Sequence, residues 1–395
     1  MILKEVYRKN KDDIKGVLLG NYPDFVFRKK AKLEFGKIPV FVFHSVTADK
    51  FEKQLRYLAD NGYKTINADC FYEVLTGSKK PQENTIVLTF DDGLGSLWTV
   101  AYPLLKKYGF TGISFLIPSF IKEDYGNYPN LEDVWQGRFS VEKISSREES
   151  LPLCSWAEVD KMHESGIIDF QSHSHFHCSV FISDKLVDFV NPAFEPSLLK
   201  NSLNPLILKD GKETLPGKVD LGFPIYEWDA NLGAESRYIE SEMVSTSCME
   251  FVNNNGGKDF FNKPNWRVQL KNYWEDSRSK YEETKKFQTV EERQNDIRKD
   301  LAESKKEIER KLDKDVKHLC YPWYKGNLYS VHISKEAGYE SNYWGLIKNR
   351  AINIIGDNPF FVRRINEQFI FSLPGEGRKP LYNIMGNKVL SLMKN

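Results

Sequence analysis

The stretch from Ile86 to Gly93 reads IVLTFDDG, and it combines a strand with the polar residues that follow it. Its first five residues are apolar or β-branched, which indicates a strand buried on both faces of a parallel sheet. Two aspartates and a glycine follow at once, a composition typical of a turn. Active sites of parallel β/α folds lie where the strands end, so the stretch predicts acidic residues at a catalytic face.

Outward from this stretch, predicted strands alternate with predicted helices. Strands are expected at 38–43, 86–90, 112–117, 167–170 and 316–321, and helices at 51–58, 97–108, 155–166 and 297–316. The third helix begins with a capping box formed by Ser155 and Glu158. Such alternation predicts an α/β fold built on a parallel sheet or barrel.

The alternation is interrupted between His177 and Val290, which divides the chain into four parts. We expect an N-terminal extension (1–36), the first part of a barrel (37–180), an insertion (181–289), and the rest of the barrel with a C-terminal tail (290–395). The insertion is expected over or beside the catalytic face, where it would narrow the pocket. Its aromatic residues Phe223, Tyr226 and Trp228 are the candidates for approaching substrate. A barrel flank or a subunit contact is the alternative.

Charge and cysteine content exclude some classes of protein. The 395 residues carry 56 Lys and Arg against 55 Asp and Glu, interspersed in sign, which argues against a nucleic-acid partner. The N-terminus does not read as a signal peptide, and no apolar run is long enough to cross a bilayer. Five scattered cysteines without CxxC spacing indicate reduced thiols. We therefore expect a cytoplasmic protein without a transmembrane segment. The sequence is also compatible with an oligomer.

Five polar clusters follow predicted strands or apolar runs. They are His44, the pair Asp91-Asp92, the segment 173–177 (HSHFH), the segment 322–324 (PWY), and the pair Arg363-Arg364. Strand ends meet at one face of a β/α barrel, so one pocket is expected to hold all five clusters.

A carboxylate with two imidazoles supplies three ligands for a divalent metal and leaves a position for water, as catalytic zinc sites do. Asp91 and Asp92 are adjacent, so we expect one to bind metal and the other to take a proton from attacking water. The histidines leave two pairs open. An extended chain places His173 and His175 on one face, whereas a helical turn places His173 with His177.

The sequence resembles the polysaccharide deacetylase family, which is carbohydrate esterase family 4 or the NodB-homology family. The segment 89–93 (TFDDG) matches its first motif and 173–177 (HSHFH) matches its second. The resemblance implies a distorted (β/α) barrel, here with a large central insertion. It also implies that Asp91 is the general base and that Asp92, His173 and His177 bind one divalent metal. Zinc is expected first, with Co²⁺, Ni²⁺, Mn²⁺ and Fe²⁺ as alternatives, and His175 becomes a spacer.

Looser similarities extend the resemblance to 38–46 and to 321–327 (YPWYKGN). They imply that the backbone N–H of Trp323 helps to hold an oxyanion and that Arg364 supports the catalytic aspartate. Two departures stand out, because Cys320 replaces an arginine of the third motif and the late histidine that serves as general acid is absent. His44 is our substitute for that acid, with a structural histidine as the alternative.

The resemblance implies a metal-dependent hydrolase of carbon–nitrogen bonds other than peptide bonds. Its substrate would be an N-acylated amino sugar in a polysaccharide or glycoconjugate precursor, with acetyl as the first choice of acyl group. Trp323 and Tyr324 offer flat faces for sugar stacking. Trp228 is a further candidate, but for it the alternative of a core aromatic is favoured. The alternatives are a cytoplasmic hydrolase of a small cyclic imide, ureide or formamide, and an inactive metal- or carbohydrate-binding relative.

Overall fold

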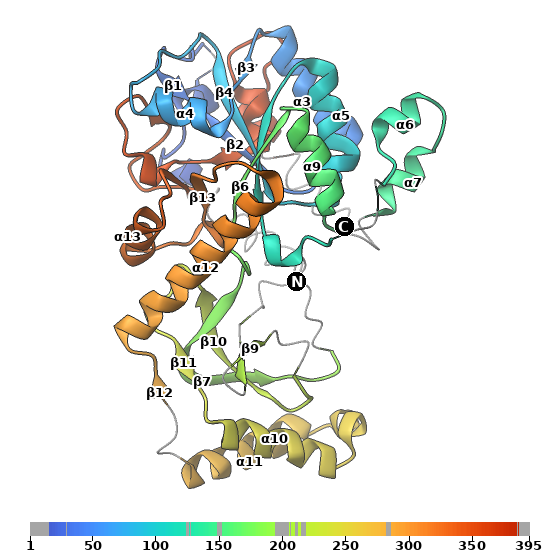
Figure 1. The fold of residues 1–395 in the computed structure, drawn as a ribbon, viewed down its shortest axis with the longest axis vertical. Coiled ribbons are helices and arrows are strands. Elements are labelled where there is room, and N and C mark those ends of the chain that lie inside the picture. The colour runs from blue at the N-terminus through green and yellow to red at the C-terminus, as the bar shows by residue number, and fades with distance from the viewer. Residues whose placement is uncertain are drawn as a thin grey trace. The chain divides into compact units, whose positions relative to one another are not determined.

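The computed structural model describes residues 16–28, 30–123, 126, 128–147, 152–193, 205, 207–209, 212–214, 219–281, 286–384 and 386 (Figure 1). Much of the expected N-terminal extension and most of the C-terminal tail lie outside these residues. The chain forms two compact units. Unit 1 comprises Met1–Phe176, Asp300–Tyr324 and Ser334–Asn395, and unit 2 comprises His177–Lys299 and Lys325–Ile333.

Unit 1 is built on a curled parallel sheet with the strand order β14-β13-β6-β5-β4-β2-β16, and β3 pairs with β4 beside this path. A parallel bridge between Tyr343 and Val362 links β14 to the segment that leads into β16, so the sheet curls into a half-barrel. This confirms the predicted α/β barrel-like class. The strands are β2 (Val40–Phe43), β3 (Lys64–Thr65), β4 (Thr85–Asp92), β5 (Gly112–Leu116), β6 (Ile168–Ser172), β13 (His318–Cys320), β14 (Ser341–Tyr343) and β16 (Ile365–Asn366).

Helices pack against this sheet, and Figure 1 shows α3, α5 and α9 together on one side of it. The helices of unit 1 are α2 (Asp24–Phe27), α3 (Ala48–Asp60), α4 (Ala68–Leu75), α5 (Tyr102–Tyr108), α6 (Leu131–Trp135), α7 (Val141–Ser145) and α9 (Trp156–Glu164). The helix α12 (Val290–Leu312) begins in unit 2 and ends in unit 1, and α13 (Leu328–Glu336) begins in unit 2 and ends in unit 1. Shorter elements complete unit 1, namely a π-helical turn at Leu97–Ala101, 3₁₀ turns at Pro118–Phe120, Pro322–Tyr324, Pro359–Phe361 and Glu367–Ser372, and an antiparallel pair of β1 (Lys37–Ile38) and β15 (Asn353–Ile354).

Most predicted elements are present, with local departures that have physical causes. The strand expected at 38–43 is divided into β1 and β2 by Pro39, which has no N–H for the ladder. The helix expected at 97–108 begins as a π-helical turn. The helix expected to reach Val316 is shorter than predicted. It is α12, which ends at Leu312, and the next residue, Asp313, has a left-handed φ of 46°.

The predicted capping box at the start of α9 is confirmed. The Ser155 hydroxyl accepts a hydrogen bond from the Glu158 N–H, and the Glu158 carboxylate accepts one from the Ser155 N–H. Arg147 holds both oxygens of that carboxylate at 2.6 Å, and both side chains are buried. The cap is therefore anchored by an ion pair as well as by its own hydrogen bonds.

Unit 2 has a core of its own. Strands β7 (Ser179–Phe189) and β10 (Pro224–Ala230) form an antiparallel ribbon, and α10 (Glu242–Asn254) packs against α11 (Trp266–Lys280). Its shorter elements are the hairpin of β8 (Ile207–Lys209) and β9 (Lys212–Thr214), the pair of β11 (Tyr238–Ile239) and β12 (Lys286–Phe287), and a 3₁₀ turn at Gly257–Asn262. A continuous cluster of buried aliphatic and aromatic side chains joins the ribbon to the helices.

The aromatic segment of unit 2 does not fit the expectation that it approaches substrate. Phe223 and Tyr226 are buried in this core, and the Tyr226 hydroxyl accepts a hydrogen bond from the Trp274 indole N–H at 2.9 Å. Trp228 is partly buried and packs against the same cluster. The expectation is therefore wrong for Phe223 and Tyr226, because these rings stabilise unit 2 itself.

All five cysteines are described and form no disulfide, and Cys70 is the one that is not fully buried. Burial raises the pKa of Cys154 and of Cys248 to about 12, so both stay protonated near neutral pH. We expect a thiol reagent at pH 8 to label Cys70 alone in the native protein and all five cysteines after denaturation. Cys70→Ser should abolish native labelling, and rapid labelling of several native thiols would contradict the packing described here.

Candidate metal and catalytic site

The candidate site lies at the carboxyl ends of the parallel strands of unit 1. Asp91 and Asp92 end β4, His44 follows β2, and His173 follows β6. Cys320 ends β13, whereas Arg364 stands immediately before β16. The structure brings His44, His173, Cys320 and Arg364 within 4 Å of the Asp91 carboxylate. The strand ends thus meet as the sequence predicts, and Arg364 joins them from a strand start.

Asp91 is a buried carboxylate held by a buried arginine. The two guanidinium nitrogens of Arg364 donate to its two oxygens at 2.6 and 2.9 Å. Arg364 also donates to the Trp344 carbonyl oxygen and to the Thr89 hydroxyl, which fix the fork in place. Burial acts to raise the pKa of Asp91, but Arg364 and His173 lower it further than burial raises it. Asp91 is therefore ionised and oriented in the folded protein.

This pair has a testable consequence for stability. Arg364→Met should lower the free energy of unfolding by about 3–5 kcal/mol, because it leaves a buried carboxylate without its counter-charge. Urea unfolding followed by circular dichroism would measure the change. The double variant Asp91→Asn/Arg364→Met removes both charges and should recover part of the loss. Equal stability of Arg364→Met and the unmodified protein would contradict this account of the pair.

Asp92, His173 and His177 form a group that fits a divalent metal. One ligand atom from each lies within 4.8 Å of the others. The His173 Nε2 lies 3.4 Å from an Asp92 oxygen, while its Nδ1 lies 2.9 Å from the Cys320 carbonyl oxygen. A carbonyl oxygen only accepts, so Nδ1 carries a proton, and Nε2 is the ring nitrogen that would bind a metal beside Asp92. One carboxylate and two imidazoles are also the donor types of catalytic zinc sites.

A second group, Asp91, His173 and Cys320, also brings three ligand atoms together. The Cys320 sulfur lies 3.9 Å from each Asp91 oxygen, and burial raises the pKa of its thiol. Both Asp91 oxygens are already bonded to the Arg364 guanidinium, whose charge opposes a cation at that place. The group that contains Asp92 is therefore the better metal site.

Left-handed backbone conformations concentrate at the site. Asp92, His177, Trp323 and Tyr324 have φ of 71°, 43°, 50° and 62°. Such conformations cost roughly 1–3 kcal/mol each for residues with a side chain and cluster at functional sites. Gly93 has φ 71°, and an added Cβ would lie 2.7 Å from the Leu116 side chain, so the third residue of the DDG segment must be glycine.

The structure distinguishes between the two histidine pairs that spacing left open. It groups His177 with His173 and Asp92, and His175 is in neither metal group among the described residues. The His175 Nδ1 lies 3.6 Å from a Glu307 oxygen, and its ring packs edge-on against Phe176. His175 thus takes the spacer position that the family resemblance implies.

The remaining predicted residues differ in their distance from Asp91. The His44 side chain is 51% exposed, and its Nε2 lies 3.9 Å from an Asp91 oxygen. Trp323 is partly buried in the turn after β13. Tyr324 beside it is 38% exposed, with its ring centroid 5.2 Å from the Arg364 guanidinium carbon. Arg363 faces elsewhere and donates to Asn21.

Sequence reasoning missed two parts of this arrangement. The Cys320 carbonyl oxygen orients His173, and the Thr89 hydroxyl and Trp344 carbonyl help to hold Arg364. Backbone carbonyls occur at every residue, so no sequence signal marks these two. Thr89 lies in the first motif, but it was interpreted only as a strand residue, and no role was predicted for its hydroxyl.

Comparison with known proteins agrees with this geometry. Residues 78–188 match the polysaccharide deacetylase family, a stretch that contains Asp91, Asp92 and all three clustered histidines. The predicted resemblance to this family is thereby confirmed over residues 78–188.

Two relatives illustrate the extent of the likeness. The chain is 37% identical over 89 residues to YxkH of Bacillus subtilis strain 168, whose name classes it with polysaccharide deacetylases. The aligned stretch covers 20% of this chain and 32% of YxkH. The chain is 28% identical over 132 residues to a poly-β-1,6-N-acetyl-D-glucosamine N-deacetylase of Staphylococcus epidermidis, covering 33% of this chain and 38% of that protein. The chain thus spans about a third of the length of each of these relatives.

A solved structure shares the fold. The BpsB deacetylase domain of Bordetella bronchiseptica aligns with a TM-score of 0.50 at 14% identity, covering 85% of this chain and 97% of that one. At this identity the likeness concerns the fold alone. No helix among the described residues has both the length and the apolar character needed to cross a membrane.

Proposed function

We propose that this protein is a metal-dependent N-deacetylase that removes acetyl groups from N-acetylated amino sugars in a polysaccharide or its precursor. The observation that carries the proposal is the group of Asp92, His173 and His177 beside a carboxylate, Asp91, that Arg364 orients. The name of the Staphylococcus epidermidis relative supports an N-acetylglucosamine polymer as substrate class. The cytoplasmic location and any oligomer stay predictions.

Asp92, His173 and His177 would hold one divalent metal, with zinc as our first choice. When bound, such a metal lowers the pKa of a coordinated water and polarises an acyl carbonyl. The Nδ1–H of His173 is bonded to the Cys320 carbonyl oxygen, so Nε2 is the nitrogen that would bind the metal.

Asp91 would receive the proton of the attacking water. It is ionised in the folded protein, and Arg364 fixes both of its oxygens, so it needs no reorientation before it accepts the proton. Arg364 acts through Asp91 and is a positioning residue.

Two further groups complete the proposed reaction. The Trp323 backbone N–H would stabilise the oxyanion that forms from the acyl carbonyl. His44 would donate a proton to the departing amine, and its position 3.9 Å from an Asp91 oxygen allows it to be reloaded from that carboxylate through a water. The flat faces of Trp323 and Tyr324 would contact the sugar ring.

A substrate panel tests this proposal. The panel contains poly-β-1,6-N-acetyl-D-glucosamine, a chitin oligosaccharide and a small cyclic imide, and acetate release or imide opening is measured with zinc-loaded protein. We expect acetate from at least one of the two sugar substrates and no imide opening. Hydrolysis of the imide alone would replace the proposal with the rival hydrolase function.

A further inference from the structure

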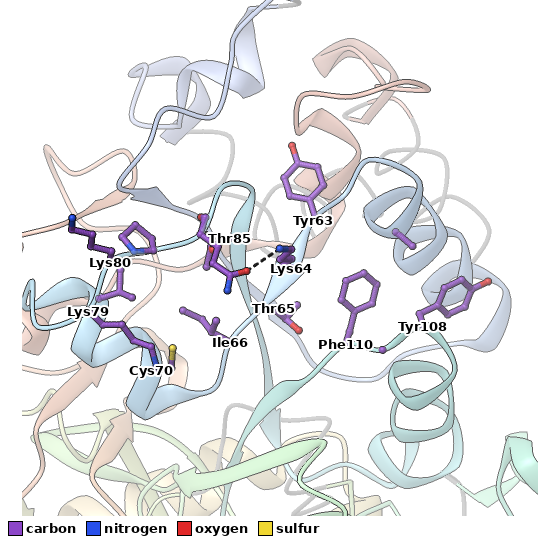
Figure 2. Close-up of a pocket in the computed structure, with 15 residues that line it drawn as sticks. Tyr63, Lys64, Thr65, Ile66, Cys70, Lys79, Lys80, Thr85, Tyr108 and Phe110 are labelled. Carbon is purple, nitrogen blue, oxygen red and sulfur yellow. Dashed lines mark hydrogen bonds between the residues drawn. The ribbon is translucent and has the colours of Figure 1, made fainter.

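A cavity lies at the opposite end of β4 from Asp91 and Asp92, and Figure 2 shows the residues that line it. It has a volume of about 500 Å³, within the usual range for small-molecule clefts. Thr85, the first residue of β4, lines it, whereas Asp91 and Asp92 are the last two residues of that strand. At about 3.3 Å per residue, the two places are roughly 20 Å apart. The cavity therefore does not belong to the candidate catalytic site.

The cavity combines a basic rim with an apolar wall. Figure 2 shows Lys79 and Lys80 beside Cys70 on one side, Tyr108 and Phe110 on the other, and Lys64 and Tyr63 between them. Ile66 and Val74 complete the apolar surface. The described residues that line the cavity include three lysines and no aspartate or glutamate.

The three lysines differ in their polar partners. Lys64 donates to the neutral Gln82 side-chain oxygen at 2.9 Å, and Lys80 is exposed at the rim. Neither makes an ion pair with the part of the chain that the structure describes, whereas Lys79 lies 3.2 Å from a Glu73 oxygen. The side chains that line the cavity therefore carry a net positive charge.

The neutral polar groups of the wall are already bonded within the protein. The Tyr63 hydroxyl donates to the Pro374 carbonyl oxygen, and the Tyr108 hydroxyl donates to Glu52. The Thr85 hydroxyl donates to the Gln82 carbonyl oxygen, and Thr65 bonds to Thr111. A sugar requires many polar partners, and this wall offers few. The lysine ammonium groups and the apolar faces remain for recognition.

We propose that this cavity binds a small organic anion, a carboxylate or phosphate with an aromatic or aliphatic body. The anionic group lies against Lys64 and Lys80, where charge-assisted hydrogen bonds are available. The apolar body lies against Tyr63, Ile66 and Phe110. The site is distinct from the deacetylation chemistry, and its occupation does not require a bound metal.

Cys70 provides a built-in reporter for this site. It lines the cavity, and it is the one described cysteine that is not fully buried. Its thiol and Glu73 raise the pKa of Lys79, which places the thiol against an ammonium group. A ligand in the cavity should therefore protect Cys70 from alkylation.

The test uses the anionic dye 8-anilinonaphthalene-1-sulfonate and its neutral analogue N-phenyl-1-naphthylamine as probes. We expect the anion to bind more tightly and to slow the alkylation of Cys70 by iodoacetamide. Lys64→Gln/Lys80→Gln should weaken binding of the anion by about fivefold or more, if each charge contributes about 0.5 kcal/mol. The matched control Lys53→Gln, an exposed lysine outside the cavity, should leave binding unchanged.

Competition and activity complete the test. Benzoate should displace the dye at lower concentration than inorganic phosphate, because only benzoate has an apolar body, and the Lys64/Lys80 double variant should deacetylate normally. Equal binding of the two dyes, unprotected Cys70, or undiminished dye binding by the double variant would overturn the proposal. Displacement of the dye by inorganic phosphate at lower concentration than by benzoate would contradict the proposed contact between an apolar body and the cavity wall.

Discussion

Replacement of Asp92 or His177 by alanine should strip the metal and abolish deacetylation, because each change removes one of three protein ligands. The two side chains present their ligand atoms within 4.8 Å of each other and of His173. A site with two protein ligands leaves a divalent metal without the coordination that catalytic sites provide. Metal content measured by plasma mass spectrometry after dialysis, together with acetate release, would give the result.

His175→Ala is the matched control for this prediction. Its ring lies near Glu307, and it stands two residues from His173 and two from His177. We expect this variant to keep near-normal metal content and most of its activity. If the His177→Ala variant kept its metal and the His175→Ala variant lost it, the second histidine ligand would be His175 and the assignment made here would be wrong.

Asp91→Asn should keep the metal but lose roughly 10²-fold or more in kcat, the usual scale for removal of a general base. Asparagine has nearly the same shape and still accepts one hydrogen bond from Arg364, but it cannot take the proton of the attacking water. Turnover of an N-acetylated sugar polymer under saturating conditions is the measurement.

Two controls separate chemistry from folding in this variant. Arg364 loses its buried counter-charge when Asp91 becomes neutral, so circular dichroism and metal content must be measured on the same preparation. A folded, metal-loaded Asp91→Asn variant with full activity would contradict the role of Asp91. In that case the carboxylate would serve only to balance Arg364.

The local part of the site was predictable because its signals are contiguous in sequence. The stretch IVLTFDDG places a buried strand directly before two aspartates, and HSHFH follows another strand. Register between parallel strands then brings Asp91 and Asp92 opposite Phe115 and Leu116 on β5. The meeting of strand ends follows from the topology of parallel sheets.

The contacts that orient these residues were harder to predict. Arg364 and Asp91 are separated by 273 positions, and the predicted support of one by the other rested on family resemblance. Residue spacing does not encode the turn between the histidines, where Ser174 and His177 have left-handed φ of 63° and 43°. The bond from His173 to the Cys320 carbonyl involves a backbone atom, which no residue type reveals.

The aromatic residues of unit 2 illustrate a different limit. Phe223 and Tyr226 looked like ligand-binding residues because they stand in an insertion that was expected over or beside the catalytic face. They are instead buried in a second core that joins β10 to α10 and α11. Composition shows that aromatic rings are present, but the burial of a ring depends on which elements pack over it. The part that unit 2 plays in substrate choice stays a prediction.

The central claim is that Asp92, His173 and His177 hold a metal required for removal of acetyl groups from an N-acetylated amino sugar. It is tested most directly by acetate release from poly-β-1,6-N-acetyl-D-glucosamine. One preparation would be compared as purified, after removal of metal by a chelator, and after addition of zinc. The account predicts that release stops when the metal is removed and returns when zinc is added. Unchanged acetate release by the metal-free protein would contradict it.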